Sequence, residues 1–178
     1  MGVKQLWERE ESRFLILFLV ILAFFFLVIA LQSVNDAIVV PYTTFVARVS
    51  GQILHAFGED LSINGCVLRS PRFAVTIYNG CNGLITSLIF IAGVLAFPAR
   101  FSAKLLGVIG GLLAIQAINL VRIVSLFYIG VFFPKFFNSS HVFIWQSIVI
   151  LFGVGLWIVW AQKFGRPGKK GSPSAETE

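Results

Sequence analysis

Three residues of the sequence carry side chains that could together perform covalent chemistry: Cys81, Arg122 and His141. A cysteine supplies a nucleophilic sulfur, and a nearby histidine can act first as a general base and then as a general acid. An arginine supplies a fixed positive charge that can stabilise an oxyanion. Cys81 and His141 each lie just before an apolar segment, and Arg122 interrupts a third one. If those segments bring the three side chains together, the set predicts nucleophilic catalysis.

Two of these residues are predicted at helix starts. Cys81 follows Asn79 and Gly80, either of which can cap a helix, so its sulfur is expected in the first turn, where the helix dipole stabilises a thiolate. His141 follows the capping residues 138–140, and a helix start favours the neutral imidazole that a general base requires. Taken alone, a histidine at this place is also typical of a membrane interface.

The composition predicts a chain that spans a membrane. Of its 178 residues, 57% are hydrophobic and only 12% are charged, about half the charged fraction of a soluble domain. The apolar residues form four blocks, at 14–31, 84–97, 105–133 and 142–160, which predict four transmembrane helices, or five if the third block is broken. Acidic residues before the first block and its length favour a signal anchor over a cleaved signal peptide.

Basic residues predict the orientation of these helices. Nine of them fall on three short segments that a four-helix topology places inside: Lys4, Arg9, Arg13, Arg100, Lys104, Lys163, Arg166, Lys169 and Lys170. The other side receives only Arg48, Arg69, Arg72 and Lys135. Since cytoplasmic loops carry the excess of Lys and Arg, both termini are predicted inside. The net charge of +6 therefore indicates topology and no nucleic-acid partner.

The predicted topology places Arg122 close to the outer boundary. It lies roughly 25 Å along a helix that begins after Lys104, within a hydrocarbon core of about 30 Å. Gln116 and Asn119 share its helical face, which favours an inward-facing polar site. Snorkelling of Arg122 to the lipid headgroups is the structural alternative.

The segment 33–80 is predicted to lie outside the membrane, between the first and second helices. Apolar residues at helical spacing predict an amphipathic helix over 42–57, and two β-like runs, 61–68 and 73–77, predict a hairpin. The fold class is therefore an all-α polytopic membrane protein with a small extracytoplasmic helix and β-hairpin. Its predicted parts are a cytoplasmic N-terminus (1–13), the first helix (14–32), the outer segment (33–80), a catalytic bundle (81–161) and a disordered basic tail (162–178). Small residues that would let helices approach closely are Gly107, Gly110, Gly111, Gly153 and Gly155.

Short motifs around the three reactive residues resemble those of the exosortase/archaeosortase family. Tyr78-Asn79-Gly80-Cys81-Asn82-Gly83-Leu84 resembles its Cys-x-Gly motif, and Asn119-Leu120-Val121-Arg122-Ile123 resembles its Asn-x-x-Arg-Ile/Val motif. His141, just before the final apolar block, matches the third position. Order, spacing and topology agree over about 80–160. The chain is shorter than many members, and Asn79-Gly80 replaces the acidic or small residues often found before the cysteine.

The resemblance implies a membrane cysteine protease or transpeptidase that cleaves C-terminal sorting signals of exported proteins. Such signals combine a short motif, a transmembrane helix and a basic end, of the PEP-CTERM kind. The implied roles are nucleophile for Cys81, transition-state stabiliser for Arg122 and proton transfer for His141, with Asn119 and Asn82 in support. The chain is most similar to the compact exosortase H subgroup, whose targets carry an IPTLxxWG-type signal. The implied location is the bacterial inner membrane, with the site facing the periplasm or exterior, in contact with lipid and without a cofactor.

Two alternatives remain open from the sequence. Cys66 and Cys81 could form a structural disulfide in an oxidising compartment. Arg122 and its polar face could then serve a small transporter or anion-binding protein, and a purely structural subunit is a third possibility. No zinc-ligand spacing occurs, so no metal is expected. A group that orients His141 is not evident, although Asn82, Asn119 or Asn138 could do so if the fold brings one of them close.

Overall fold

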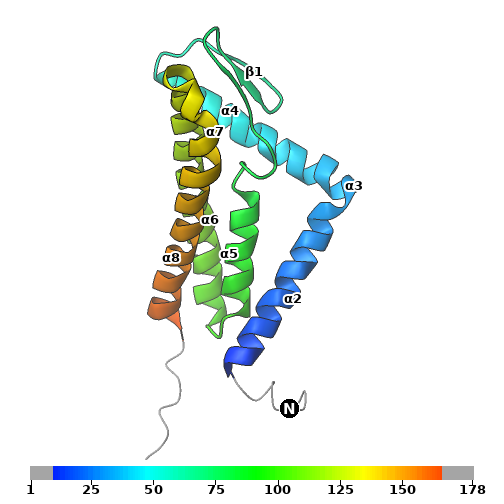
Figure 1. The fold of residues 1–178 in the computed structure, drawn as a ribbon. Helices are drawn as coiled ribbons and strands as arrows, with labels where there is room; N and C mark the ends of the chain where they lie inside the picture. Colours follow the sequence, from blue (N-terminus) through cyan, green and yellow to red (C-terminus); the bar gives the residue numbers. More distant parts are fainter. Residues whose placement is uncertain (1–9, 166–178) are drawn as a thin grey trace, which may run out of the picture.

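A computed structural model describes residues 10–165 of the chain. Residues 1–9 and 166–178 lie outside the described residues, and with them most of the predicted cytoplasmic N-terminus and of the predicted disordered tail. Four helices run lengthwise through the molecule in Figure 1: α2 (Glu10–Ala30), α5 (Leu84–Ala96), α6 (Phe101–Phe132) and α8 (Gln146–Phe164). The helix α4 (Val40–Ala56) crosses one end of them, with a small β-sheet beyond it (Figure 1). We call this end the sheet end, and the end where α2 begins and α8 finishes the terminal end.

Short helical pieces join these elements at the sheet end. The turn between α2 and α4 consists of α3 (Gln32–Val34) and a π-helical stretch, η1 (Asn35–Val39). The polypeptide between α6 and α8 is helical throughout, as η2 (Pro134–Phe136), α7 (Phe137–Ser139) and the π-helical η3 (Ser140–Trp145). The helical run that ends in α8 therefore starts at Pro134, whose fixed φ angle suits a first helical position.

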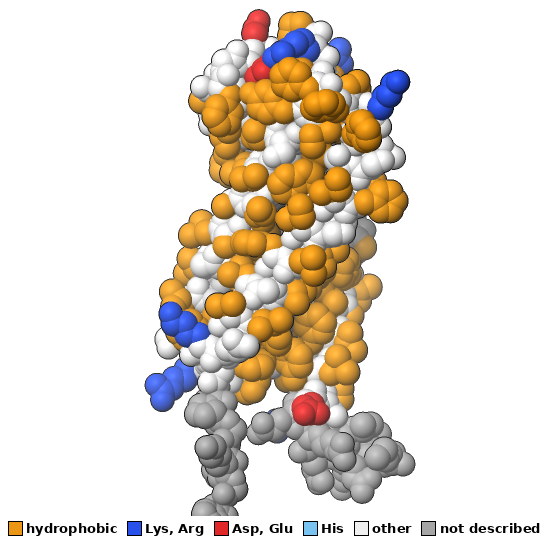
Figure 2. All heavy atoms as spheres, turned by 60° about the vertical axis from the view of Figure 1, so that its left-hand side comes forward, with side chains coloured by type: hydrophobic (Ala, Val, Ile, Leu, Met, Phe, Trp, Pro, Cys, Tyr) orange, Lys and Arg blue, Asp and Glu red, His pale blue; other side chains and the backbone are white. Residues whose placement is uncertain are grey.

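The surface of the helices is that of a membrane protein. Among the described residues, four helical stretches are long and apolar enough to cross a membrane: Glu11–Ala30, Gln32–Ala56, Phe101–Phe132 and Pro134–Phe164. Large apolar side chains face outward along them, such as Leu27 and Leu151, each 70% exposed. Figure 2 shows such side chains over the middle of one face, with charged side chains gathered at its two ends. A water-soluble monomer rarely exposes so large an apolar surface, so the predicted class of mostly helical polytopic membrane protein is confirmed.

The helices that are long enough to span a membrane differ from the predicted ones in two places. The predicted second span is α5, whose 13 residues cover only about 20 Å. The stretch Gln32–Ala56 qualifies by length and composition, although the sequence predicts an extracytoplasmic helix there. The helix α4 buries one face, with Val46, Ala47 and Leu54, and leaves Phe45 exposed.

The sheet has three strands where the sequence predicts two. Its antiparallel order is β1 (Ser62–Asn64), β2 (Val67–Arg69) and β3 (Ala74–Thr76). The apolar run 61–68 is divided by a two-residue turn, in which Gly65 has a φ of 57° and no other residue has a positive φ. A positive φ at the first turn position only is the type II′ pattern, which suits the twist of a tight hairpin. The signal for this turn was present in the sequence as Asn64-Gly65, and the prediction passed over it by reading 61–68 as one strand.

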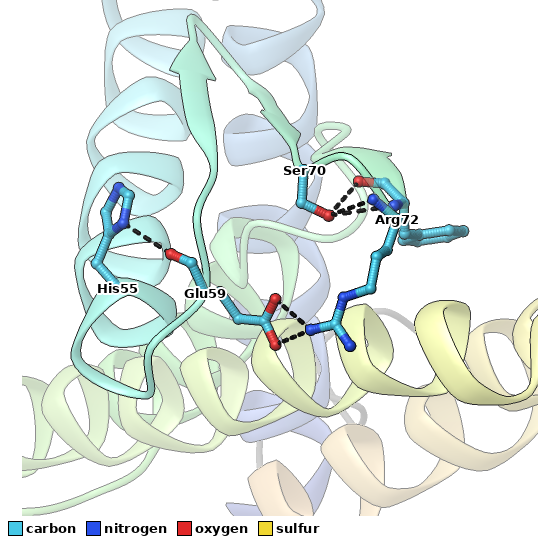
Figure 3. Close-up of polar contacts among 5 residues, drawn as sticks. His55, Glu59, Ser70 and Arg72 are labelled. Atoms are coloured by element: carbon cyan, nitrogen blue, oxygen red, sulfur yellow. Dashed lines mark hydrogen bonds and ion pairs between the residues drawn. The ribbon is translucent and has the colours of Figure 1, made fainter.

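Polar contacts fasten the loop between β2 and β3 to the end of α4. The guanidinium of Arg72 donates to both carboxylate oxygens of Glu59, at 2.5 and 2.6 Å (Figure 3). Ser70 Oγ accepts the backbone N–H groups of Arg72 and Phe73, while His55 Nδ1 contacts the Glu59 carbonyl at 2.9 Å (Figure 3). Glu59 is only 9% exposed, so this ion pair is more protected from solvent than a typical surface pair.

The terminal end is held by aromatic side chains that pack against glycines. Phe90, Val94, Ile115 and Trp160 form its buried core. A Cβ added at Gly111 would lie 2.0 Å from the Phe90 ring, and one at Gly107 would lie 2.4 Å from Trp160. Two other glycines predicted at helix contacts, Gly110 and Gly155, have no neighbouring atom within 4 Å, and Gly153 meets only Thr86.

Candidate active site

Cys81 lies in a loop before α5 and not in its first turn. The helix begins at Leu84, after Gly83, which has a left-handed φ of 79° that helical residues do not adopt. The Leu84 N–H donates to the side-chain oxygen of Asn82 at 3.0 Å, so Asn82 satisfies one free donor of the helix start. The predicted caps, Asn79 and Gly80, are therefore wrong, and Cys81 precedes the helix instead of lying in its first turn.

Two residues of α4 fix this loop. The Asn82 side-chain amide donates to Thr43 Oγ1 at 2.8 Å, and Tyr42 donates its hydroxyl to the Asn82 carbonyl at 3.2 Å. Asn82 and Thr43 are almost completely buried. The loop also packs closely on α6, since a Cβ at Gly83 would lie 2.8 Å from Gln116 Nε2. Neither Tyr42 nor Thr43 was predicted for the site, because nothing in the local sequence shows that α4 crosses over the cysteine loop.

Arg122 points into the protein at the sheet end of α6. Its side chain is 3% exposed, and Nη2 lies 3.8 Å from Cys81 Sγ. Its Nε has no hydrogen-bond partner among the described residues. Because the guanidinium is buried beside the cysteine, snorkelling to the lipid headgroups is not its arrangement.

His141 completes the cluster, from the π-helical stretch η3. Its Nε2 lies 2.7 Å from Cys81 Sγ, which is within hydrogen-bonding distance. The imidazole stacks on the Phe137 ring, with centroids 6.1 Å apart and planes inclined by 7°. The predicted cap at 138–140 is wrong, because the helical run has already begun at Pro134. Single π-helical turns occur frequently at functional sites, where they change the direction of a side chain.

Among residues 10–165, the His141 ring stacks on Phe137, and no polar third residue bonds to it. Asn82 bonds to α4, and the amide of Asn119 has no partner among the described residues. Asn138 lines the same cavity as His141 but makes no hydrogen bond to it. Phe137 could have been found from the sequence, since it precedes His141 by one helical turn, had the helix been started at Pro134.

The environment of Cys81 sets the protonation of its thiol. Partial burial raises the pKa of Cys81 above its ordinary value, while the Arg122 charge and a backbone hydrogen bond with Tyr78 act in the opposite direction. Burial is the largest of these effects, and it opposes the thiolate that the sequence predicts at this position. His141 Nε2, 2.7 Å from the sulfur, is placed to take the proton.

A cavity of about 420 Å³ opens onto the cluster. Its size lies within the range of roughly 300–1,000 Å³ that is typical of ligand pockets. Residues 74–78 line it together with Phe137, Asn138 and His141, and α6 contributes Ile123 and Leu126 beside Arg122. The strand β3 and the cysteine loop thus share one cavity with the catalytic cluster.

The two cysteines are separate and free. Cys81 contacts His141, whereas Cys66 lies 3.6 Å from Thr44 Oγ1 and forms no disulfide. The alternative of a structural disulfide is thus not what the structure contains. Within residues 10–165, no group of three His, Cys, Asp or Glu side chains could hold a metal ion.

The fold and the site together define a polytopic membrane protein with a cysteine–histidine–arginine cluster at one end of its helices. The sequence profile of transmembrane exosortases matches residues 6–161, most of the chain, so the protein belongs to the transmembrane exosortase family. This confirms the resemblance drawn from the motifs. The family implies a membrane protease or transpeptidase that acts on exported proteins with C-terminal sorting signals. No curated protein and no solved structure matches the chain significantly.

Proposed function

We propose that this protein is a membrane cysteine protease or transpeptidase that cleaves the C-terminal sorting signals of exported proteins. The observation that carries the proposal is the contact of 2.7 Å between Cys81 Sγ and His141 Nε2. A nucleophile and a base at hydrogen-bonding distance are the signature of covalent catalysis. The two residues are separated by 60 positions in the sequence, so the contact is a product of the tertiary fold.

The first half of the reaction forms a thioester. His141 Nε2 takes the proton of the Cys81 thiol, and the sulfur attacks the scissile carbonyl carbon of the substrate. The Arg122 guanidinium, 3.8 Å from the sulfur, offers its charge to the oxygen that becomes negative. When the intermediate collapses, the C–N bond breaks and protonated His141 returns its proton to the departing amine. The C-terminal part of the signal leaves as a free amine.

The second half resolves the thioester. Water or an amine attacks the acyl carbon, and His141 accepts the proton of that nucleophile. The C–S bond breaks, and the sulfur regains a proton. Water yields a free carboxylate on the processed protein, whereas an amine yields a new amide. The partly buried site limits access for water, which is the physical condition under which an amine acceptor competes.

The site is proposed to face the periplasm or exterior of a bacterial inner membrane. Arg13, Arg100, Lys104 and Lys163 lie at or beside the helix ends of the terminal end. Five further basic residues of the sequence adjoin α2 and α8 outside the described residues: Lys4, Arg9, Arg166, Lys169 and Lys170. The positive-inside rule then orients the terminal end to the cytoplasm and the sheet end outward.

The substrate type is proposed from the resemblance to the compact exosortase H subgroup. A suitable reporter is a secreted protein that ends in an IPTLxxWG-type signal, a transmembrane helix and a basic tail. Co-expression with the wild-type enzyme is expected to shorten the reporter, and Cys81→Ala is expected to abolish this processing. Cys66→Ala is the matched control, since Cys66 lies away from His141. Equal loss of processing and of membrane-inserted protein in both variants would indicate a structural role for both cysteines and would refute the proposal.

A further inference from the structure

Both outer strands of the β-sheet lack a further partner strand among the described residues, and the free edge of β3 borders the catalytic cavity. In the order β1-β2-β3, the strand β3 pairs only with β2. The Ile77 N–H donates to the Cys66 carbonyl, and the Phe73 carbonyl accepts the Ser70 N–H, both at 2.9 Å. Residues 73, 75 and 77 therefore direct their backbone groups toward β2.

The intervening residues of β3 direct theirs to the open edge. Backbone groups alternate in direction along a strand, so the N–H and C=O groups of Ala74 and Thr76 point away from β2. None of these groups has a hydrogen-bond partner among residues 10–165. Natural proteins usually protect such an edge with charged side chains or proline. The stretch 74–78 carries neither.

This open edge forms a wall of the catalytic cavity. Residues 74–78 line it together with Phe137, Asn138 and His141. Phe73, just before the strand, makes an edge contact with the ring of Phe137, with ring centroids 5.2 Å apart, so the start of β3 packs against α7. The edge leads directly into the loop that carries Cys81. A chain lying along β3 would thus arrive at the nucleophile.

We propose that the extracytoplasmic segment of the substrate adds to β3 as an extended strand, and that this pairing presents the scissile bond to Cys81. The inference rests on the proposed protease function and names how its substrate binds. Strand addition obtains affinity from main-chain hydrogen bonds and specificity from alternate side chains. Here alternate substrate side chains would face the apolar floor of Ile123 and Leu126, so apolar residues are expected at every second position.

The first test removes one outward donor from the edge. Thr76→Pro deletes the outward N–H without breaking a bond to β2, and it keeps Val75 in the extended conformation that the strand already has. Thr76→Ala removes the same side chain but retains the N–H. With purified full-length enzyme and the reporter in proteoliposomes, KM for Thr76→Pro is expected to exceed that for Thr76→Ala by roughly tenfold, since a hydrogen bond is lost and the ring blocks a paired strand. kcat is expected to change much less.

The second test measures binding without chemistry. A photo-crosslinking residue is placed at successive positions before the scissile bond of the reporter, and the reporter is mixed with full-length Cys81→Ala enzyme. Attachment to residues 74–78 or to α6 that alternates with a period of two is expected. The crosslinking pattern also tests strand addition to β3 if the Thr76→Pro protein does not fold.

The outcomes separate this inference from the proposed function. If the wild-type enzyme cleaves the reporter but crosslinking shows no alternation, or both Thr76 variants have equal KM, strand addition is wrong and the protease function stands. If the wild-type enzyme does not cleave the reporter, the proposed function fails and the inference fails with it.

Discussion

The two ends of the helical bundle are held together by different kinds of interaction. At the terminal end, Phe97 makes edge contacts with Trp157 and Trp160, and the glycines of α6 admit Phe90 and Trp160 to the helix backbone. At the sheet end, the cysteine loop is fixed by hydrogen bonds from Tyr42 and Asn82 and lies over a buried arginine. Apolar packing therefore holds the first region, whereas the second combines an apolar core of its own, which includes Leu54, Leu68 and Phe127, with buried polar pairing.

The sheet end also leaves more of its polar groups without partners. Both polar atoms of the Asn119 amide and the Nε of Arg122 are buried and have no hydrogen-bond partner. Among the described residues of the terminal end, Trp157 Nε1 is the only such atom. A buried polar group without a partner costs about 1–3 kcal/mol, and an arginine inside a membrane costs more as a rule. Stability alone would not favour this arrangement. Both ends have a packed apolar core, and the difference is that most of the unpaired buried polar groups lie at the sheet end, beside Cys81.

The largest difference between an effect on activity and an effect on stability is expected when the proton-transfer residue is replaced. His141→Ala should lower the rate of reporter processing by about 10²–10⁴, because the thiol loses its base. The free energy of unfolding should change little, since the imidazole is not part of a buried core. Processing rates normalised to membrane-inserted protein, together with thermal unfolding in detergent, measure both quantities. An unfolding temperature that falls in step with the rate would assign His141 to the structure instead.

Removal of the buried charge is expected to have the next largest effect. Arg122→Gln should lower kcat by about 10²–10³, as loss of an oxyanion donor does. The same change removes a charge from a buried position, so the protein should be no less stable. Arg122→Lys, which keeps a charge but not the planar fork, serves as the comparison and should retain more activity. Wild-type kcat in Arg122→Gln would contradict the proposed role.

A packing change at the terminal end should have the opposite pattern. Gly111→Ala places a methyl group 2.0 Å from the Phe90 ring and should destabilise the fold by about 1–3 kcal/mol. The matched control is Gly110→Ala, which meets no atom within 4 Å and should leave stability unchanged or slightly raised. Processing per folded molecule should be the same in both. If Gly111→Ala instead lowers kcat without lowering stability, the two ends are coupled more closely than the contacts indicate.

The hydrogen bonds between α4 and the cysteine loop offer a finer test. Thr43→Val removes the acceptor of the Asn82 amide and should cost about 1 kcal/mol of stability. Because the loop is then less firmly placed, kcat should also fall by several-fold, with KM less affected. Thr44→Val on the same helix is the control, since Thr44 contacts Cys66 and not the cysteine loop. Equal effects of the two substitutions on kcat would show that the hydrogen bond from Asn82 to Thr43 does not position the cysteine loop.

The smallest expected change is a shift in pH dependence. Since burial holds the pKa of the Cys81 thiol above its ordinary value, alkylation of Cys81 in a Cys66→Ala protein should increase with pH into the alkaline range. The Arg122 charge lowers this pKa, so Arg122→Gln should move the alkylation profile to still higher pH. Iodoacetamide labelling followed by mass spectrometry at a series of pH values measures the midpoint. A shift toward lower pH would show that the guanidinium does not stabilise the thiolate.

The sequence predicted correctly which three residues meet in the site and wrongly how two of them are placed at helix starts. The motifs and their distance along each apolar segment predict that Cys81, Arg122 and His141 meet at one end, and the structure brings their side chains together. The argument from helix starts is wrong, because Gly83 delays α5 and Pro134 begins the other helical run early. Both residues act through backbone geometry, which a pattern of polar capping residues does not include.

The sequence by itself determined the features that depend on composition along the chain. These are the apolar blocks, the mostly helical class, the placement of basic residues and the reactive residue types. Hydrophobicity and charge act on each segment separately, so they can be read segment by segment. The tertiary structure alone decided that α4 crosses the cysteine loop, that Phe137 orients His141, and that β3 presents an open edge to the cavity. These features join residues far apart in sequence, and their energies depend on the simultaneous packing of several elements.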